Sequence, residues 1–171
     1  GTAIVGAGLS EKSLLSETII PEPYHGQRVE LRLLDNGDKV WYLNGKIHRE
    51  DGPAREYSDG SKAWYLNGKL HREDGPAIEY STRKYNGGKE WYLNDKLHRE
   101  DGPAVELSWV KQWYLNGKLH REDGPAREYS DGSKAWYLNG KIHREDGPAR
   151  EYSDGDKVWY LNGKIHREDG P

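Results

Sequence analysis

A repeat of about 23 residues constrains this chain more than any other feature. The tetrapeptide Trp-Tyr-Leu-Asn begins six times, at spacings of 23, 27, 22, 23 and 23 residues: Trp41, Trp64, Trp91, Trp113, Trp136 and Trp159. Three residues separate each tetrapeptide from the sequence His-Arg-Glu-Asp-Gly-Pro, which is unchanged in all six copies. A single unit of this size cannot form a core, so the copies are expected to bury their apolar faces against one another.

Turn signals divide each copy into segments that are too short for ordinary helices. Asn-Gly, Asp-Gly-Pro and Asp-Gly leave about five residues between them, which is a typical strand length. Asn67-Gly68 suits a type I′ hairpin turn because both residues tolerate positive φ. Counting outward from a two-residue turn predicts four cross-strand pairs: Leu66 with Lys69, Tyr65 with Leu70, Trp64 with His71 and Ala63 with Arg72.

Alternation along these strands places apolar side chains on both faces of the hairpin. Tyr65 and Leu70 share one face, and Trp64, Leu66 and His71 share the other. One face is expected to pack in the core and the other to form an aromatic ridge, and the pattern leaves open which is which. The two rows of aromatic residues are Trp41, Trp64, Trp91, Trp113 and Trp136, and Tyr42, Tyr65, Tyr92, Tyr114 and Tyr137.

The segment after each Gly-Pro is expected to carry the sheet into the next copy. Residues 54–57 would pair, through a turn at 58–61, with the strand that leads into Trp64. Extra residues at 81–88 and a shortened copy around Trp109 both fall in this turn, which is therefore expected to face outward. The sequence predicts an all-β, elongated, solenoid-like stack of antiparallel hairpins over residues 28–171, preceded by an extended arm and proline linker over residues 1–27.

The unit resembles the MORN repeat family in several places. The shared elements are Tyr65, Asn67-Gly68-Lys69, His71 and a late Asp131-Gly132 pair. The copies depart from the family after the His, where Arg-Glu-Asp-Gly-Pro replaces the usual glycines, so this is a MORN-like variant. The resemblance covers residues 41–171. It implies elongated β-hairpin sheets used as scaffolds, dimerisation surfaces or lipid-binding elements, and it does not imply catalysis.

Composition argues against several functions. The 26 Lys and Arg residues nearly balance 29 Asp and Glu residues and are interspersed with them, which disfavours a nucleic-acid partner. The absence of Cys excludes disulfides and thiolate chemistry. No apolar run approaches the roughly 20 residues that span a bilayer, so membrane binding is not expected. The chain begins without Met, as expected of a processed product or a fragment, and an extracellular, cell-surface or virion-surface location is favoured.

Repeated polar residues raise the question of a metal or catalytic site. Copies two strands apart lie roughly 10 Å from each other, too far for two imidazoles to share one ion. A structural role for the histidines, stacking across from Trp or bonding a turn carbonyl, is therefore favoured over metal binding. Arg-Glu-Asp supplies paired carboxylates, but six equal copies offer no privileged environment. We expect no enzyme activity, no catalytic residues, no metal site and no cofactor. The six histidines are His48, His71, His98, His120, His143 and His166.

The two ends of the sequence suggest self-assembly. Earlier copies continue past Gly-Pro into another strand, whereas the last stops there, and residues 1–9 are uncharged and strand-like. Such a segment can complete a neighbour's sheet by strand addition, and contacts between opposite ends give an open, head-to-tail filament. The expected donor residues are Thr2, Ala3, Ile4, Val5 and Leu9. The expected acceptor residues are Trp159, Leu161, Ile165, His166 and Pro171.

Two functions therefore follow from the sequence. The first is a non-enzymatic structural protein that associates with itself head to tail as the subunit of an extracellular fibre. The second is a MORN-like interaction scaffold that presents its aromatic and arginine-bearing face to a protein, a glycan or a membrane surface. In the second case the arm is a leader or a cap and not a donor strand.

Overall fold

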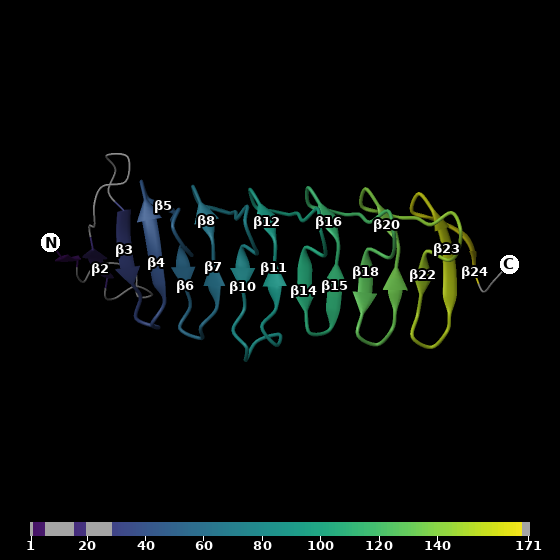
Figure 1. The fold of residues 1–171 in the computed structure, drawn as a ribbon, viewed down its shortest axis with the longest axis horizontal. Coiled ribbons are helices and arrows are strands. Elements are labelled where there is room, and N and C mark those ends of the chain that lie inside the picture. Colours follow the sequence, from purple (N-terminus) through teal and green to yellow (C-terminus); the bar gives the residue numbers. More distant parts are fainter. Residues whose placement is uncertain (1, 6–15, 20–28, 169–171) are drawn as a thin grey trace.

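The protein is an elongated array of short antiparallel strands, as the computed structural model of residues 2–5, 16–19 and 29–168 shows (Figure 1). All of the regular secondary structure in these residues is β, which confirms the predicted fold class. The strands follow one another along the long axis in nearly the order of the sequence. Within the same residues, no helix has the length and apolarity to cross a membrane.

One 14-stranded sheet runs through the array, and smaller hairpins project from it. The main sheet consists of β3 (Val29–Leu33), β4 (Lys39–Leu43), β5 (Lys46–Ile47), β6 (Arg55–Glu56), β7 (Lys62–Ala63), β10 (Ile78–Glu79), β11 (Lys89–Glu90), β14 (Val105–Leu107), β15 (Val110–Gln112), β18 (Arg127–Tyr129), β19 (Lys134–Ala135), β22 (Arg150–Glu151), β23 (Lys157–Leu161) and β24 (Lys164–Glu168). The separate hairpins are β8 (Tyr65–Leu66) with β9 (Lys69–Leu70), β12 (Tyr92–Leu93) with β13 (Lys96–Leu97), β16 (Tyr114–Leu115) with β17 (Lys118–Leu119), and β20 (Tyr137–Leu138) with β21 (Lys141–Ile142).

The hairpin turns have the predicted geometry. Asn67 and Gly68 have φ values of 51° and 79°, the left-handed backbone that a type I′ turn requires at both positions. The residues next to the turn pair as predicted, Tyr65 with Leu70 and Leu66 with Lys69. One step further out, the His71 N–H donates to the Trp64 carbonyl at 3.0 Å.

The predicted pair of Ala63 with Arg72 is wrong. Ala63 lies opposite Arg55 on one side and Ile78 on the other, so both of its edges are already occupied in the main sheet. The chain therefore leaves the hairpin after His71, and the Arg72 N–H donates to the Tyr92 carbonyl of the next repeat at 3.2 Å.

Each repeat continues the main sheet of the previous one, as predicted. Strand β6 pairs with β7, and β7 pairs with β10 of the following repeat. The turn between β6 and β7 faces outward, since residues 58–60 are exposed. The longer loop has exposed residues at 82–86, and the shortened turn exposes Trp109. Both length changes therefore lie at the lower edge of Figure 1, away from the hairpin tips.

A column of alanines forms the most buried part of the array. The Ala that follows each Gly-Pro is 0% exposed in the five described copies: Ala54, Ala77, Ala104, Ala126 and Ala149. Its backbone joins two repeats. The Ala77 N–H, for example, donates to the Glu90 carbonyl at 2.8 Å, while its own carbonyl accepts from the Trp64 N–H at 2.7 Å. A side chain at this position has neighbouring backbone on both sides.

The two ends of the array differ from its middle. In the last repeat the chain does not leave the hairpin after the His, and β24 continues alongside β23 until Glu168 lies opposite Val158. At the other end, β1 (Thr2–Val5) and β2 (Ser16–Ile19) form an antiparallel hairpin, with β2 beside β3 (Figure 1).

We expect Ala126→Leu to lower the free energy of unfolding by about 1–3 kcal/mol, because extra methylene groups must fit into a packed column. Urea denaturation followed by circular dichroism measures the change. The exposed turn residue Ser130 provides the control, since Ser130→Leu should alter stability by less than about 0.5 kcal/mol. Equal effects of the two substitutions would contradict the packing assigned to the alanine column.

Candidate interaction site

An arginine organises the loop that follows each hairpin. Arg121 donates from Nε to Asp123 Oδ1 at 3.1 Å and from a terminal nitrogen to the Pro125 carbonyl at 3.0 Å. The same terminal nitrogen lies 3.1 Å from Glu128 Oε1. The guanidinium also lies over the ring of Trp113, 3.9 Å from the centroid. We call this arrangement the arginine clamp, because it fixes a loop that contains no regular secondary structure.

The clamp recurs in every repeat whose arginine side chain the structure describes. The guanidinium-to-ring distances lie between 3.8 and 4.1 Å, for Arg49 over Trp41, Arg72 over Trp64, Arg99 over Trp91, Arg121 over Trp113 and Arg144 over Trp136. It also explains a glycine in the motif. A Cβ added at Gly124 would lie 3.0 Å from Arg121 Cζ, so a larger residue would push the guanidinium from its place.

The histidines join consecutive repeats. His120 Nδ1 accepts a hydrogen bond of 2.9 Å from the backbone N–H of Asn139, at the hairpin turn of the next repeat. The adjacent Gly140 N–H donates to the Leu119 carbonyl at 2.8 Å. Five histidines make the equivalent bond at 2.9–3.1 Å, His48 to Asn67, His71 to Asn94, His98 to Asn116, His120 to Asn139 and His143 to Asn162.

This bonding fixes the tautomer of the ring. Because Nδ1 accepts a hydrogen bond, the proton of the neutral imidazole must be on Nε2, which lies 3.8 Å from Glu122 Oε1 in the case of His120. The histidines thus have a structural role, in which Nδ1 accepts a hydrogen bond from a backbone N–H of the next repeat. The ring does not bond a turn carbonyl through this nitrogen. In the described part of the chain, no three His, Asp or Glu side chains gather in a group that could hold a metal ion.

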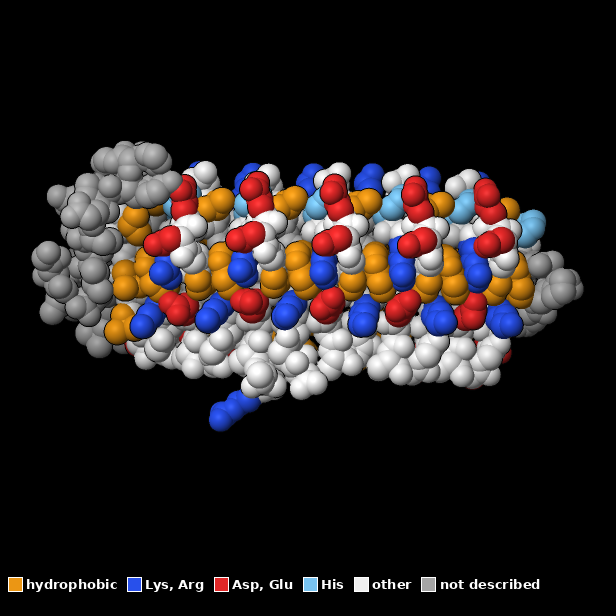
Figure 2. Space-filling model, in the orientation of Figure 1, with side chains coloured by type: hydrophobic (Ala, Val, Ile, Leu, Met, Phe, Trp, Pro, Cys, Tyr) orange, Lys and Arg blue, Asp and Glu red, His pale blue; other side chains and the backbone are white. Residues whose placement is uncertain are grey.

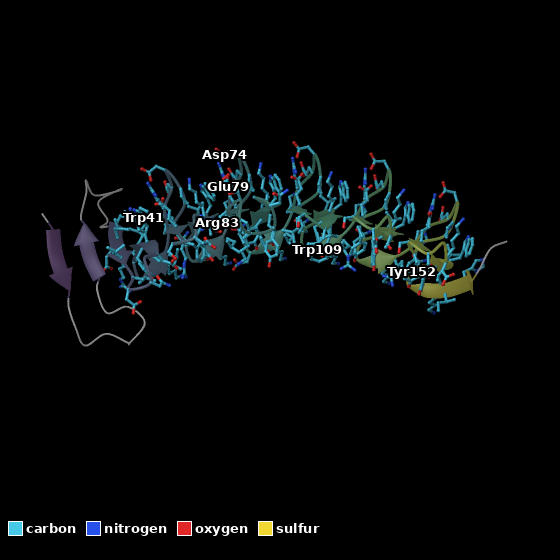
Figure 3. All side chains as sticks on the ribbon, turned by 90° about the horizontal axis from the view of Figure 1, so that it is seen from below. Trp41, Asp74, Glu79, Arg83, Trp109 and Tyr152 are labelled. Carbon is cyan, nitrogen blue, oxygen red and sulfur yellow. The ribbon has the colours of Figure 1, made fainter. Side chains whose placement is uncertain are left out.

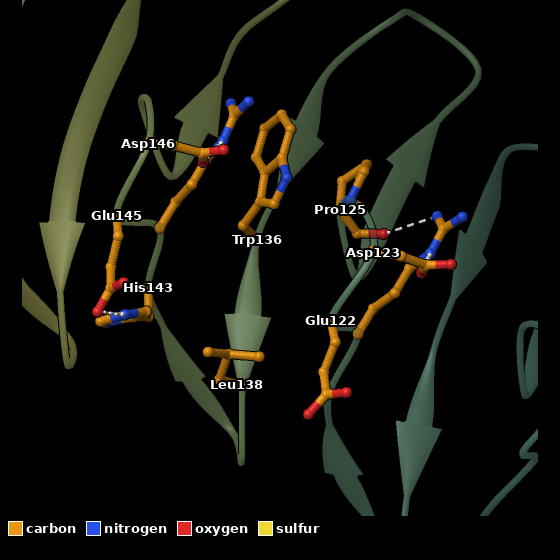
Figure 4. Close-up of a pocket in the computed structure, with 11 residues that line it drawn as sticks. Glu122, Asp123, Pro125, Trp136, Leu138, His143, Glu145 and Asp146 are labelled. Atoms are coloured by element: carbon orange, nitrogen blue, oxygen red, sulfur yellow. Dashed lines mark hydrogen bonds and ion pairs between the residues drawn. The ribbon is translucent and has the colours of Figure 1, made fainter.

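Equivalent hollows lie between successive repeats on the face that carries the clamps, and four of them are well formed in the described part of the chain. The hollow between the fourth and fifth repeats (Figure 4) is bounded by Glu122, Asp123 and Pro125 on one side and by Trp136 and His143 on the other. Each hollow encloses 660–690 Å³, and the lining residues are equivalent from one to the next. Trp64, Leu66 and His71 line one of them together, so the prediction that these three share a face is confirmed.

The hollows have a negative rim. Two arginines and four carboxylates surround the hollow of Figure 4, which gives it a net charge of −2 when His143 is neutral. The Glu122 and Asp123 side chains are 84% and 88% exposed, whereas Arg121 is only 23% exposed and is already bonded. Red carboxylates therefore follow the array in a regular series (Figure 2), and Asp74 projects away from the ribbon (Figure 3).

Neither aromatic row forms the core alone. The tryptophans of the first five repeats are half-buried beneath their arginines, and only Trp159 is buried. The tyrosines Tyr42, Tyr65, Tyr92, Tyr114 and Tyr137 are also half-buried. Glu90 accepts hydrogen bonds from Tyr80 and, at 2.8 Å, from Tyr92. Burial, reinforced by Glu90, raises the pKa of both tyrosines, which therefore remain neutral donors.

The predicted assembly residues lie at opposite ends of the array. Thr2, Ala3, Ile4 and Val5 form β1, while Trp159, Leu161, Ile165 and His166 belong to the hairpin of β23 and β24. Leu161 and Ile165 are 37% and 58% exposed. Leu9 and Pro171 lie outside the described residues. The structure does not bring donor and acceptor residues together within one molecule.

The sequence analysis missed the arginine clamp. Its signal is the fixed order Arg-x-Asp-x-Pro, in which Arg contacts the residues two and four positions later. In the comparisons with known proteins, no family model and no curated protein matches the chain. The resemblance to MORN repeats therefore stays a prediction that depends on the motif itself.

We expect Arg121→Lys to lower the free energy of unfolding by about 1–3 kcal/mol, because an ammonium cannot stack on Trp113 while also bonding Asp123 and Pro125. Urea denaturation measures the loss. The exposed Lys118→Arg makes the reverse exchange away from the clamp and should have little effect. A fully stable Arg121→Lys protein would show that positive charge alone is sufficient at this position.

The His48 bond to the next repeat predicts a loss of stability in acid. Burial lowers the pKa of His48 below 6.5, although Glu50 lies 3.4 Å from its Nε2. The folded state therefore binds this proton less readily than the unfolded state does. The stabilising contribution is complete above about pH 6.5 and is lost as the pH falls through the lower, folded-state pKa.

The His48→Asn variant tests this pH dependence, since the Asn side-chain oxygen accepts a hydrogen bond from the position of Nδ1 but does not titrate. Urea midpoints between about pH 7.5 and pH 5 should fall less steeply in the variant than in the parent protein. The control is His166→Asn, because His166 Nδ1 accepts no backbone N–H among the described residues. In this variant the urea midpoint should depend on pH as steeply as in the parent protein. Identical slopes for all three proteins would contradict the assignment.

Proposed function

We propose that this protein is a non-enzymatic structural subunit that assembles head to tail through the two ends of its sheet. The observation that carries the proposal is the exposed apolar surface of the last hairpin. Ile165 is 58% exposed, whereas the equivalent residue of each earlier repeat is buried or half-buried: Ile47, Leu70, Leu97, Leu119 and Ile142. Among the described residues, this apolar position of the last hairpin is thus more exposed than its equivalents in the earlier repeats.

Unused hydrogen-bonding groups support the same proposal. Among the described strands, β24 is the last strand of the main sheet and pairs with β23 alone. Five histidines accept an N–H from the next repeat, but no donor for His166 Nδ1 occurs within the described residues. An exposed strand edge with unpaired backbone groups is a template for adding another strand.

The other end of the array supplies a suitable strand. Strand β1 is uncharged in sequence and pairs only with β2 among the described strands, which leaves its outer edge available. In the proposed contact, β1 of one copy pairs along β24 of the next. Because the two edges lie at opposite ends, the contact repeats without closing and produces a filament. An extracellular location remains a prediction of the sequence.

The alternative function is an interaction scaffold, and the row of hollows is the observation that favours it. The arginine clamp covers one face of each Trp, which leaves less ring surface for stacking on a sugar. The negative rim disfavours anionic lipid headgroups. A protein partner with basic residues is therefore the scaffold ligand that the hollows favour.

Substituting Ile4→Asp and Val5→Asp together should convert filaments into monomers, because two carboxylates would have to enter an apolar strand contact. Negative-stain electron microscopy and sedimentation velocity measure the change. The exchange Ile4→Val with Val5→Ile keeps the strand apolar and should preserve filaments. A peptide of residues 1–9 should block growth, and filaments that persist after deletion of residues 1–9 would overturn the proposal.

A further inference from the structure

A row of exposed lysines lies at the hairpin tips. The residue after each Asn-Gly or Asn-Asp turn is Lys, and all six are exposed: Lys46, Lys69, Lys96, Lys118, Lys141 and Lys164. We call these the tip lysines. None has a carboxylate within 4.0 Å among the described residues. The stem of Lys118 lies against Gly140 of the next turn, with its Cβ 3.7 Å from the position that a glycine Cβ would occupy.

The lower lysines of the main sheet, which are Lys62, Lys89, Lys111 and Lys134, also have no carboxylate within 4.0 Å among the described residues, but their cross-strand neighbours are glutamates. Lys62 lies in register between Glu56 on one neighbouring strand and Glu79 on the other. The remaining three each have two glutamates in the same cross-strand positions. Figure 2 shows the result as alternating blue and red side chains along the lower part of this face. In the register of the sheet, lysines and glutamates therefore alternate along this row, whereas the tip lysine Lys69 lies opposite Leu66.

The rims of the hollows form an unbalanced row of the opposite sign. Each repeat presents one Glu and one Asp against one Arg, and the Arg is held in its clamp. The Glu and Asp side chains of the interior repeats are 84–90% exposed. Solvent-exposed carboxylates are therefore available to cations from another molecule.

The tip lysines and the acidic rims advance along the array with the same step. Each repeat contributes two strands to the main sheet, or roughly 10 Å. The insertion at 81–88 and the shortening near Trp109 leave this step unchanged, because both lie in loops at the lower edge. Blue side chains follow the upper edge in Figure 2, with red ones just below them. Both rows therefore border the same edge of the molecule.

We infer that two copies of this chain associate side by side, with the tip lysines of each copy seated at the acidic hollows of the other. A twofold axis makes the contact reciprocal, since each copy supplies both rows. A single exposed ion pair contributes little. Matched spacing lets several pairs form together, because each contact after the first is intramolecular. Such an interface weakens as salt screens the charges.

The first test compares two fourfold variants of equal charge in sedimentation equilibrium. Replacing Lys69, Lys96, Lys118 and Lys141 by Gln should weaken lateral pairing at least about tenfold at low salt. Replacing the lower lysines, Lys62, Lys89, Lys111 and Lys134, by Gln is the matched control and should leave pairing unchanged. Raising the salt from about 20 mM to about 500 mM should separate the parental pair. Equal weakening by both variants would overturn the inference.

A charge swap tests the proposed partner. One variant carries Lys69, Lys96, Lys118 and Lys141→Glu, and the other carries Glu73, Glu100, Glu122 and Glu145→Lys. Each alone should remain unpaired, since like charges meet, and an equimolar mixture should form mixed pairs. A mixture that stays unpaired would overturn the inference. Parental protein that binds poly-lysine at low salt but never pairs with itself would also overturn it, and would make a basic protein segment the occupant.

Lateral pairing and filament growth can fail separately. The Ile4→Asp and Val5→Asp protein tests growth and should still pair laterally at low salt. The tip-lysine Gln variant should still elongate, and electron microscopy should show thinner filaments of unchanged length. Loss of lateral pairing in the Ile4→Asp and Val5→Asp protein would show that pairing depends on the ends of the sheet, and the assignment to the tip lysines would be wrong.

Discussion

Two backbone N–H groups at each hairpin turn after the first join the hairpins of this array. The Asn139 N–H bonds His120 Nδ1 and the Gly140 N–H bonds the Leu119 carbonyl, so each turn is anchored on the repeat before it. The turn geometry orients these donors. The left-handed backbone of Asn139 and Gly140 places their N–H groups on the side of the preceding hairpin. The hollows lie between hairpins that this contact joins.

The arginine clamp fixes the segment that connects each hairpin to the main sheet. After His120 the chain leaves the hairpin, and residues 121–125 connect it to the buried Ala126 at the main sheet. Arg121 holds that segment by bonding the Pro125 carbonyl, while its flat guanidinium covers Trp113. The clamp also explains why the tryptophan can be large, repeated and yet only half-buried, since its exposed ring face is covered by a cation and not by a second apolar layer.

Local chemistry made the hairpins predictable. Asn67-Gly68 determined the turn, and the turn determined the pairs Tyr65 with Leu70 and Leu66 with Lys69. The pair of Ala63 with Arg72 failed because Ala63 is already paired with strands on both sides, one of them from the next repeat. The bond from Asn67 to His48 crosses between repeats in the same way. What escaped prediction was therefore the hydrogen bonding between the hairpins of neighbouring repeats, together with the loop that the arginine clamp holds.

The bonds between hairpin turns give the array a polarity. Every one of them runs from a later repeat to an earlier one, from Asn67 to His48 and again from Asn162 to His143. A cut at any boundary between repeats would expose two N–H donors on one fragment and an imidazole nitrogen with a carbonyl oxygen on the other. Two such fragments can rejoin in only one orientation. Whole repeats could therefore be gained or lost from the middle of the array while its two ends keep their different chemistry.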